Sequence, residues 1–170
     1  AVTTVDSAGG VGQDPSLAIV GGNPAISYHD STNSNLKFAR NSAADGSGTW
    51  AIVTVDNAGD VGWFTSLAVV NGNPAISYYD NTAETLKVAR CANADCTGAA
   101  TITTVHDAAN DVGAYGAIAI GADGLPVISH YDVTASTLQV AKCNDPACAG
   151  PATITTVDDP ANAVGAWVDA

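Results

Sequence analysis

The sequence has little positive charge, no long hydrophobic run and no methionine. Only five Lys and Arg residues stand against 17 Asp and Glu residues among 170, which gives a formal net charge of −12. Because phosphate backbones are bound by Lys and Arg that displace counterions, this balance excludes nucleic acid as an expected partner and disfavours an anionic membrane surface. No apolar segment approaches the roughly 20 residues that span a bilayer, so we expect no membrane insertion.

Signals for helices and for export are missing as well. No segment keeps the 3.6-residue apolar spacing of an amphipathic helix, and no signal-peptide pattern is visible. We therefore expect an all-β chain that is a mature or excised piece of a longer protein. Hydrophobic residues make up 46% of the chain and charged residues 13%, and this composition favours a folded core over disorder.

What the sequence does contain is a threefold repeat with a period of about 50 residues, which indicates a solenoid, a propeller or another repeat array. The segments 23–30, 73–80 and 125–132 match one another. We expect one repeat domain over 1–170, with repeats at about 1–50, 51–101 and 102–153 and a further copy starting at 154–170. In such arrays each unit buries its apolar surface only by stacking on its neighbours.

Each repeat predicts four short strands. In the second repeat they cover 67–70, 75–79, 85–90 and 101–105. The first is continuously apolar, which suits a strand covered on both faces, and the third alternates with a period of two. Gly and Asn in the first turn favour a tight hairpin. A surplus strand of the fourth type is expected at 2–5, so the prediction is three antiparallel four-stranded units plus this N-terminal strand.

The segments 67–69, 72–80 and 86–89 resemble a blade of a β-propeller, of the secreted kind related to sialidase-type (Asp-box) repeats and tachylectin-like lectins. Residues 45–50 are similar to a degenerate Asp-box, which in that family lies between the third and fourth strands. The resemblance implies a fold and not a function. Three blades are fewer than the four to eight that normally close a propeller. A β-trefoil, which also has three four-stranded repeats, is the alternative fold, but it explains neither the surplus strand nor the tail.

Four cysteines form two matched pairs, Cys91/Cys96 and Cys143/Cys148, at the same place in two repeats. The first repeat lacks both cysteines, which is what local Cys91–Cys96 and Cys143–Cys148 disulfides predict. A four-cysteine zinc site is the alternative, but structural zinc usually shows a closer Cys-x2-Cys spacing. Disulfides persist in oxidising compartments, so we expect a secreted protein.

Aromatic residues follow the link between repeats and form the first candidate ligand site. Exposed rings at this place would suit stacking on sugars, whereas the alternative is packing between adjacent blades. The candidate residues are Trp63, Phe64, Tyr115 and Trp167.

Acidic residues of the same links form the second candidate site. Carboxylates on neighbouring loops could bridge a calcium ion, although no copy has the EF-hand pattern, and solvated turns are the alternative. The candidate ligands are Asp56, Asp60, Asp107 and Asp111. No cofactor other than this calcium is expected.

Catalytic patterns are not found. Arg40 and Arg90 are the only arginines, too few for the three-arginine site of a sialidase-type enzyme. The aspartates that recur at 30, 80 and 132 suit turn capping better than catalysis. The three histidines, at 29, 106 and 130, lack metal-ligand spacing and are expected to be ordinary polar strand residues.

These observations favour a non-enzymatic extracellular repeat module with a structural or adhesive role. Its expected partners are other copies of itself or further repeats of a longer blade array or filament. The alternative is a carbohydrate-binding propeller lectin with glycans as partners. A fragment of a glycoside hydrolase, which would need a pair of carboxylates, is less favoured.

Overall fold

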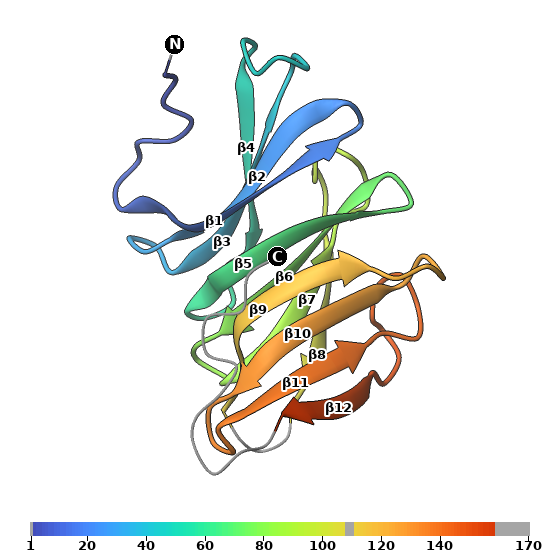
Figure 1. Ribbon diagram of the computed structural model, residues 1–170. Helices are drawn as coiled ribbons and strands as arrows, with labels where there is room; N and C mark the ends of the chain where they lie inside the picture. The colour runs from blue at the N-terminus through green and yellow to red at the C-terminus, as the bar shows by residue number, and fades with distance from the viewer. Residues whose placement is uncertain (1, 108–110, 159–170) are drawn as a thin grey trace.

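The computed structural model describes residues 2–107 and 111–158, and these form three antiparallel β-sheets of four strands each (Figure 1). In each sheet the strands follow one another in chain order, which makes three β-meanders. We call them blade 1 (β1–β4), blade 2 (β5–β8) and blade 3 (β9–β12). The strands are β1 Val11–Val20, β2 Asn23–Asp30, β3 Asn35–Asn41, β4 Trp50–Asp56, β5 Val61–Val70, β6 Asn73–Asp80, β7 Thr85–Arg90, β8 Thr101–His106, β9 Val112–Ile120, β10 Pro126–Asp132, β11 Thr137–Lys142 and β12 Thr153–Asp158.

The turn between the second and third strands is built in the same way in every blade. Asp30 and Asp80 accept hydrogen bonds from the backbone amides two and three residues further on, and Asp132 accepts one from the amide of Ala135. These carboxylates hold the turn as an Asx-type cap. The prediction that the recurring aspartates cap turns is therefore confirmed.

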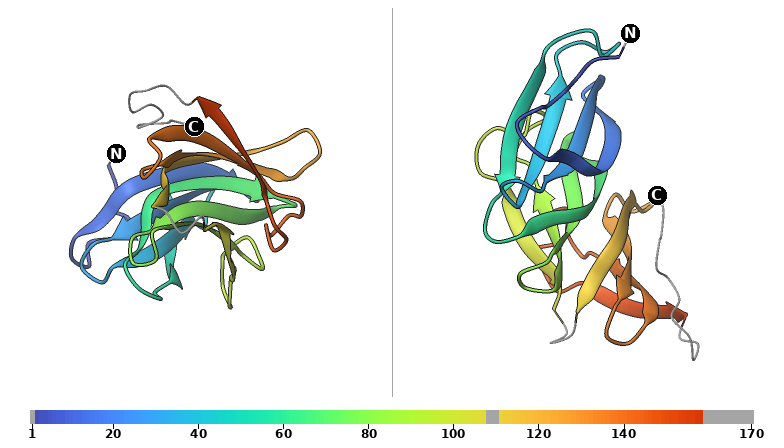
Figure 2. Two further views of the ribbon diagram at one scale, coloured as in Figure 1. Left: turned by 90° about the horizontal axis from the view of Figure 1, so that it is seen from below. Right: turned by 90° about the vertical axis from the view of Figure 1, so that its left-hand side faces the viewer.

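The hydrophobic cores lie between blades. One core joins Leu36 and Phe38 of blade 1 to Leu67 and Ile76 of blade 2, and a second joins blade 2 to blade 3. The inner strands β1, β5 and β9 pack on one another in this order (Figures 1 and 2). A blade therefore buries its apolar residues only against a neighbour, as a stacked repeat requires.

Glycine makes the close approach between blades possible. A methyl group added at Gly62 would lie 2.8 Å from Cα of Leu36, and one added at Gly113 would lie 2.6 Å from Cα of Leu86. Both glycines also have positive φ, which side chains with a Cβ rarely adopt. Any larger residue at either position would push the inner strand away from the preceding blade.

The predicted architecture is confirmed: the fold is all-β, with propeller-type blades of four antiparallel strands. Three separate, unclosed sheets exclude the β-trefoil, whose repeats share one barrel. The surplus strand predicted at 2–5 is wrong, because the structure places no strand in residues 2–10. A fourth strand pairs with the third strand of its own blade, as β4 pairs with β3, whereas residues 2–5 pair with no described strand.

The first strand of each blade is longer than predicted. β5 begins at Val61, not at Leu67, and its pairing with β6 shifts register around Trp63 and Ser66. Such a shift marks a β-bulge, where the inserted residue interrupts the period-two pattern. The sequence pattern therefore indicated only the regular half of the strand, and what looked like a link is its irregular half.

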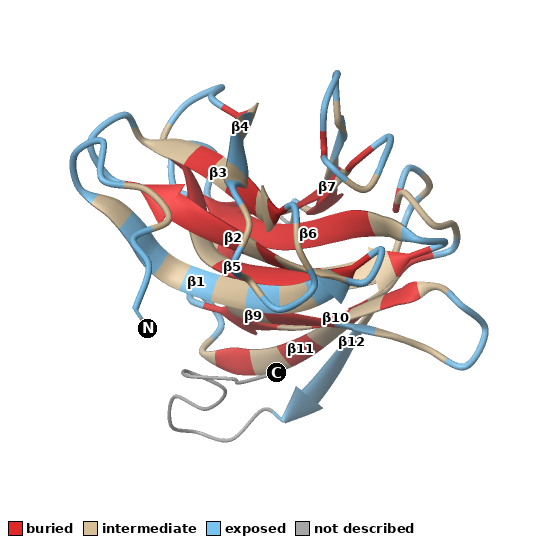
Figure 3. Ribbon diagram, turned by 90° about the horizontal axis from the view of Figure 1, so that it is seen from above, coloured by how far each residue is buried: buried red, intermediate tan, exposed pale blue. Residues whose placement is uncertain are grey.

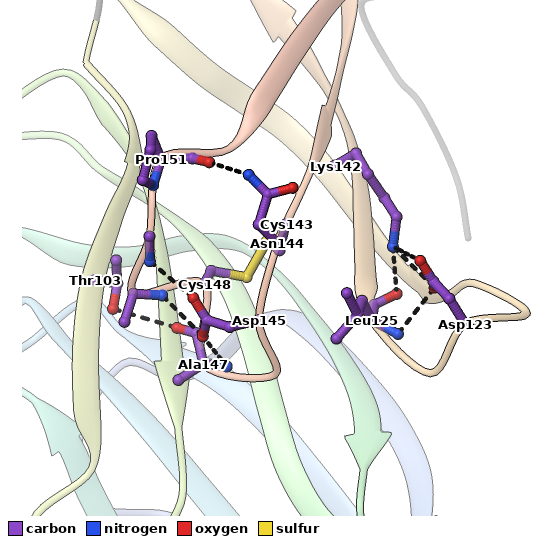
Figure 4. The surroundings of a disulfide bond; sticks show 12 residues. Thr103, Asp123, Leu125, Lys142, Cys143, Asn144, Asp145, Ala147, Cys148 and Pro151 are labelled. Atoms are coloured by element: carbon purple, nitrogen blue, oxygen red, sulfur yellow. Dashed lines mark hydrogen bonds and ion pairs between the residues drawn. A yellow bond between two sulfur atoms is a disulfide. The ribbon is translucent and has the colours of Figure 1, made fainter.

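Both predicted disulfides are confirmed, and each packs against the preceding blade. Cys91 and Cys96 belong to the core between blades 1 and 2, and the Cys143–Cys148 pair belongs to the core between blades 2 and 3. The loop of the second disulfide also accepts a hydrogen bond at Ala147 O from Thr103 Oγ1 of β8 (Figure 4). The disulfide loops therefore extend the blade junctions.

In blade 1 the buried side-chain amide of Asn41 takes the place of the disulfide. Asn41 occupies the position of Cys91, and its Nδ2 donates to the carbonyls of Gly46 and Gly48 while its Oδ1 accepts from the amides of Ala43 and Gly48. Residues 45–49 lie on this loop, between β3 and β4. Among residues 2–107 and 111–158 there is no helix long and apolar enough for a membrane span.

Candidate functional site

The candidate site is a continuous row of rings from the first and second strands of the blades. Neighbouring ring centroids lie 4.6 Å apart for His29 and Trp63, 6.2 Å for Trp63 and Phe64, 4.3 Å for Phe64 and Tyr115, and 6.2 Å for Phe64 and Tyr79. Tyr131 continues the row at 6.4 Å from Tyr115. The row crosses all three blades, and centroid separations of this size are those of favourable tilted aromatic contacts. The aromatic row comprises His29, Trp63, Phe64, Tyr79, Tyr115 and Tyr131.

The bulge of each inner strand positions these rings. Phe64 and Tyr115 have φ of 51° and 53°, and Asp14 holds the same place in blade 1 with φ of 47°. Asp14 ties blade 1 to blade 2, because its Oδ2 accepts from the amide of Phe64 and its carbonyl accepts from Thr65 Oγ1. Blade 1 thus has an anchoring carboxylate where blades 2 and 3 have rings.

Two carboxylates accept hydrogen bonds from polar atoms of the aromatic row. Trp63 Nε1 donates to Asp60 Oδ1 at 2.9 Å, and the hydroxyl of Tyr79 donates to Asp111 Oδ1 at 2.8 Å. Burial alone would raise the pKa of Asp60, but hydrogen bonds from Trp63 and Asn81 outweigh it and hold this pKa below its usual range. Burial, followed by the bond to Asp111, raises the pKa of Tyr79. At neutral pH Asp60 is therefore a carboxylate and the hydroxyl of Tyr79 is neutral.

The structure brings three of the predicted ligand-binding residues together. Trp63, Phe64 and Tyr115 are half-buried and adjacent in the row, whereas Trp167 lies outside the described residues. The sequence reasoning missed the buried Tyr79, Tyr131 and His29. Their signal was the recurring aspartate, since all three directly precede it at the end of the second strand.

The four acidic residues proposed for calcium do not form one cluster. Asp56 accepts from the hydroxyl of Tyr78 and the amide of Ala58, and Asp60 and Asp111 hold the aromatic row. Among residues 2–107 and 111–158 no group of three or more His, Cys, Asp or Glu is placed to hold a metal ion. Calcium binding that involves Asp107 or the other links stays a prediction.

A second recurring constellation, the junction pair, lies where the fourth strand of one blade meets the second strand of the next. Between blades 1 and 2 the hydroxyl of Tyr78 donates to Asp56 Oδ2 at 2.6 Å. Between blades 2 and 3 His106 Nδ1 and His130 Nε2 lie 3.0 Å apart at the equivalent positions. Burial and the carboxylate raise the pKa of Tyr78, and burial lowers that of His130 to about 4.

The outer face of blade 1, here called the acceptor face, is covered by no other blade among the described residues, and only the N-terminal segment contacts it. Leu17 is 64% exposed, although its counterparts Leu67 and Ile118 are 7% and 5% exposed in the cores between blades. A hollow of about 170 Å³ opens on this face. It is lined by Val5, Asp6, Val11, Gly12, Pro15, Ile26 and Tyr28.

The outer face of blade 3, here called the donor face, is likewise covered by no other blade among the described residues, and β12 is exposed along most of its length (Figure 3). Val157 at the end of β12 is 59% exposed, whereas Val105 at the equivalent point of β8 is 9% exposed. Leu138 and Val140 are half-buried, although their counterparts Leu86 and Val88 are fully buried. The two ends of the described chain are thus two halves of the junction that the molecule forms twice internally.

No protein-family model and no curated protein matches the sequence. Solved structures resemble the fold at TM-scores of 0.53 to 0.55. An α-L-arabinofuranosidase from Lactobacillus brevis is 13% identical over 85% of this chain and 53% of its own. A thermostable family-43 glycoside hydrolase is 16% identical over 94% and 57%. A fucose lectin from Kordia zhangzhouensis, solved with methyl-fucoside, is 9% identical over 83% and 96%.

These similarities establish a propeller-like fold and no more, because the identities are low and one fold hosts many functions. This chain spans about half the length of the two hydrolases and nearly the whole length of the lectin.

Proposed function

We propose that the chain is a non-enzymatic repeat module whose three blades form part of an open propeller-type array, and whose outer faces bind further blades. The observation that carries this proposal is the contrast between exposed Leu17 and its buried counterpart Leu67. Full burial of a leucine side chain is worth about 1.5–3 kcal/mol. Covering the acceptor and donor faces recovers this energy at several positions.

The arginines support a role without catalysis. Arg40 donates to the carbonyl of Val20 and pairs with Asp95, and Arg90 donates to the carbonyls of Val70, Pro74 and Cys91. Both guanidinium groups thus fasten the third strand to neighbouring loops. The two disulfides support an extracellular place for this role, because such bonds persist where the surroundings are oxidising.

Sedimentation velocity over a range of protein concentrations, with electron micrographs of the same samples, tests the proposal. We expect species heavier than the 16.9 kDa chain and rings or fibres in the micrographs. A single 16.9 kDa species at every concentration would contradict it.

Carbohydrate binding on the aromatic row is a second candidate function. Trp63, Phe64 and Tyr115 are half-buried and adjacent, and carboxylates at Asp60 and Asp111 lie beside the rings as hydrogen-bond acceptors. Aromatic faces with nearby polar groups are the usual composition of a small-molecule site. The fold similarity to a fucose lectin supports the same candidate.

A glycan array with the intact chain and with Trp63→Ala tests this candidate. We expect retention of a subset of glycans by the intact chain and its loss in the variant. Trp50→Ala is the matched control, because Trp50 lies at the start of β4 and outside the aromatic row. An array on which the intact chain retains nothing would remove this function.

A further inference from the structure

A third pair of the same kind as the two junction pairs lies at the acceptor face. Tyr28 occupies the position of Tyr78, and its hydroxyl donates to Asp6 Oδ2 at 2.8 Å. Asp6 directly follows Val5, just as Asp56 follows Val55 and His106 follows Val105. The same pairing therefore occurs where no blade precedes blade 1 in the described chain.

Asp6 reaches this position from a segment that belongs to no sheet, since residues 2–10 contain no strand. Lys37 Nζ adds an ion pair to Asp6 at 2.6 Å. The hydrogen bond from Lys37 outweighs burial and holds the pKa of Asp6 at about 2. Tyr28 and Lys37 together thus form a seat for a carboxylate, which the N-terminal segment fills.

Asp158 is the carboxylate that lacks such a seat. It follows Val157 at the end of β12, is exposed, and makes no side-chain hydrogen bond or ion pair with any residue in 2–107 or 111–158. In position it is the equivalent of Asp6 and Asp56. One end of the described chain thus presents a carboxylate that is unpaired among residues 2–107 and 111–158, and the other end presents its seat.

We propose, building on the function proposed above, that the acceptor face binds blade 3 of a second copy of this chain, and that Asp158 of the second copy replaces Asp6 at Tyr28 and Lys37. The backbone of the acceptor face is already shaped for this contact. Gly12 keeps the positive φ of Gly62 and Gly113, yet a methyl group added to Gly12 would meet no atom within 4 Å. That free space corresponds to the place where Leu36 and Leu86 lie in the two internal junctions.

This contact is head-to-tail, because the two faces differ and each copy carries one of each. Heterologous contacts of this kind give a closed ring or an open fibre. Two copies provide six blades, within the four to eight that close a propeller. Each copy carries a net charge of −12, so salt that screens the repulsion should strengthen the association.

Blocking each face in turn tests the head-to-tail contact by sedimentation velocity. Leu17→Glu places a charge on the acceptor face and Val157→Glu places one on the donor face, and both side chains are exposed in the single chain. We expect each variant alone to be monomeric and their equimolar mixture to form one dimer through the remaining faces. Val133→Glu, an exposed apolar residue in the β10–β11 turn, is the control and should associate like the unmodified chain. Self-association of either blocked variant, or a mixture that stays monomeric, would overturn the proposal.

Substituting Asp158 and Asp6 by Asn, one at a time, tests whether Asp158 of the second copy replaces Asp6. Asp158→Asn weakens the incoming contact, whereas Asp6→Asn weakens the resident one. Hydrogen bonds to charged groups are stronger than those between neutral groups, so we expect association at least about tenfold weaker for Asp158→Asn and a stronger association for Asp6→Asn. If the chain associates but both variants change it in the same direction, this proposal fails while the proposed function stands. A chain that never associates would remove both.

Discussion

The two internal junctions share one geometry but use different chemistry. Asp56 and Tyr78 join blades 1 and 2 through a charged acceptor and a neutral donor, whereas His106 and His130 join blades 2 and 3. Both pairs link the end of a fourth strand to the middle of a second strand, beside a core that a disulfide extends. The comparison shows that equivalent positions of the blade interface accept either a Tyr–Asp pair or a His–His pair.

A second comparison sets the internal junctions against the outer faces. Leu67 and Leu17 occupy the same position in successive blades, but only Leu67 is covered by a preceding blade. The same residue type in the same strand therefore makes very different contributions to stability.

The largest expected effect separates these two leucines. Truncation of a buried leucine costs about 2–5 kcal/mol, because the transfer energy is lost and a cavity remains. We expect Leu67→Ala to lower the free energy of unfolding by this amount, and Leu17→Ala to change it by less than about 0.5 kcal/mol, as is usual for an exposed side chain. Urea unfolding of the isolated chain at low concentration measures both. Equal losses in the two variants would contradict the described difference between the faces.

The next effect distinguishes the junction pairs by pH. Desolvation, followed by the nearby His106, lowers the pKa of His130 to about 4 from 6.5, against the opposing influence of Asp132. Burial lowers the pKa of His106 too, although Asp132 and Asp107 oppose it. The unfolded chain therefore takes up protons below about pH 6.5 that the folded chain resists. The depressed histidine pKa values therefore leave the free energy of unfolding unchanged above pH 6.5. As the pH falls from 6.5 towards 4, they lower this free energy by up to about 3 kcal/mol.

Urea unfolding at pH 7.5, 6, 5 and 4.5 measures this loss. The matched variant carries His106→Asp and His130→Tyr, which installs the chemistry of the other junction. We expect the variant to lose most of the pH dependence between 6.5 and 4. A variant with the same pH profile as the unmodified chain would show that other groups cause it.

The smallest of these effects concerns the loops that extend the junctions. By loop-closure entropy, each short disulfide ring contributes about 2 kcal/mol. We expect replacement of Cys143 and Cys148 by Ala to lower the free energy of unfolding by this amount. In blade 1 the hydrogen bonds of Asn41 take the place of the disulfide. Because reduction leaves these bonds intact, the unmodified blade 1 should keep its loop structure under reducing conditions, which proteolysis at 41–50 can report. Asn41→Ala removes these hydrogen bonds.

The regular parts of the fold could be predicted from the sequence because they follow local rules. Strand alternation, turn residues and the spacing of Cys91 and Cys96 each depend on neighbours in the chain, and all were confirmed. The expected strand at 2–5 failed because strand formation needs a hydrogen-bonding partner, and the sequence of the segment itself does not reveal whether one is present.

The candidate site could be predicted only in part. Trp63, Phe64 and Tyr115 stood out as aromatics after the link. Tyr79, Tyr131 and His29 join the row from the second strands, where each pairs with a residue at the bulge of the inner strand. The junction pairs could also be predicted from the sequence. Where Asp56 becomes His106, its partner Tyr78 becomes His130, and this paired change across repeats indicates contact.

The mass of the native particle shows directly whether the outer faces bind further blades. Light scattering on the unmodified chain and on Leu17→Glu, at matched concentrations and moderate salt, compares a free acceptor face with a blocked one. We expect multiples of 16.9 kDa that grow with concentration for the unmodified chain and a constant single-chain mass for the variant. A single-chain mass for both proteins across the whole concentration range would contradict it.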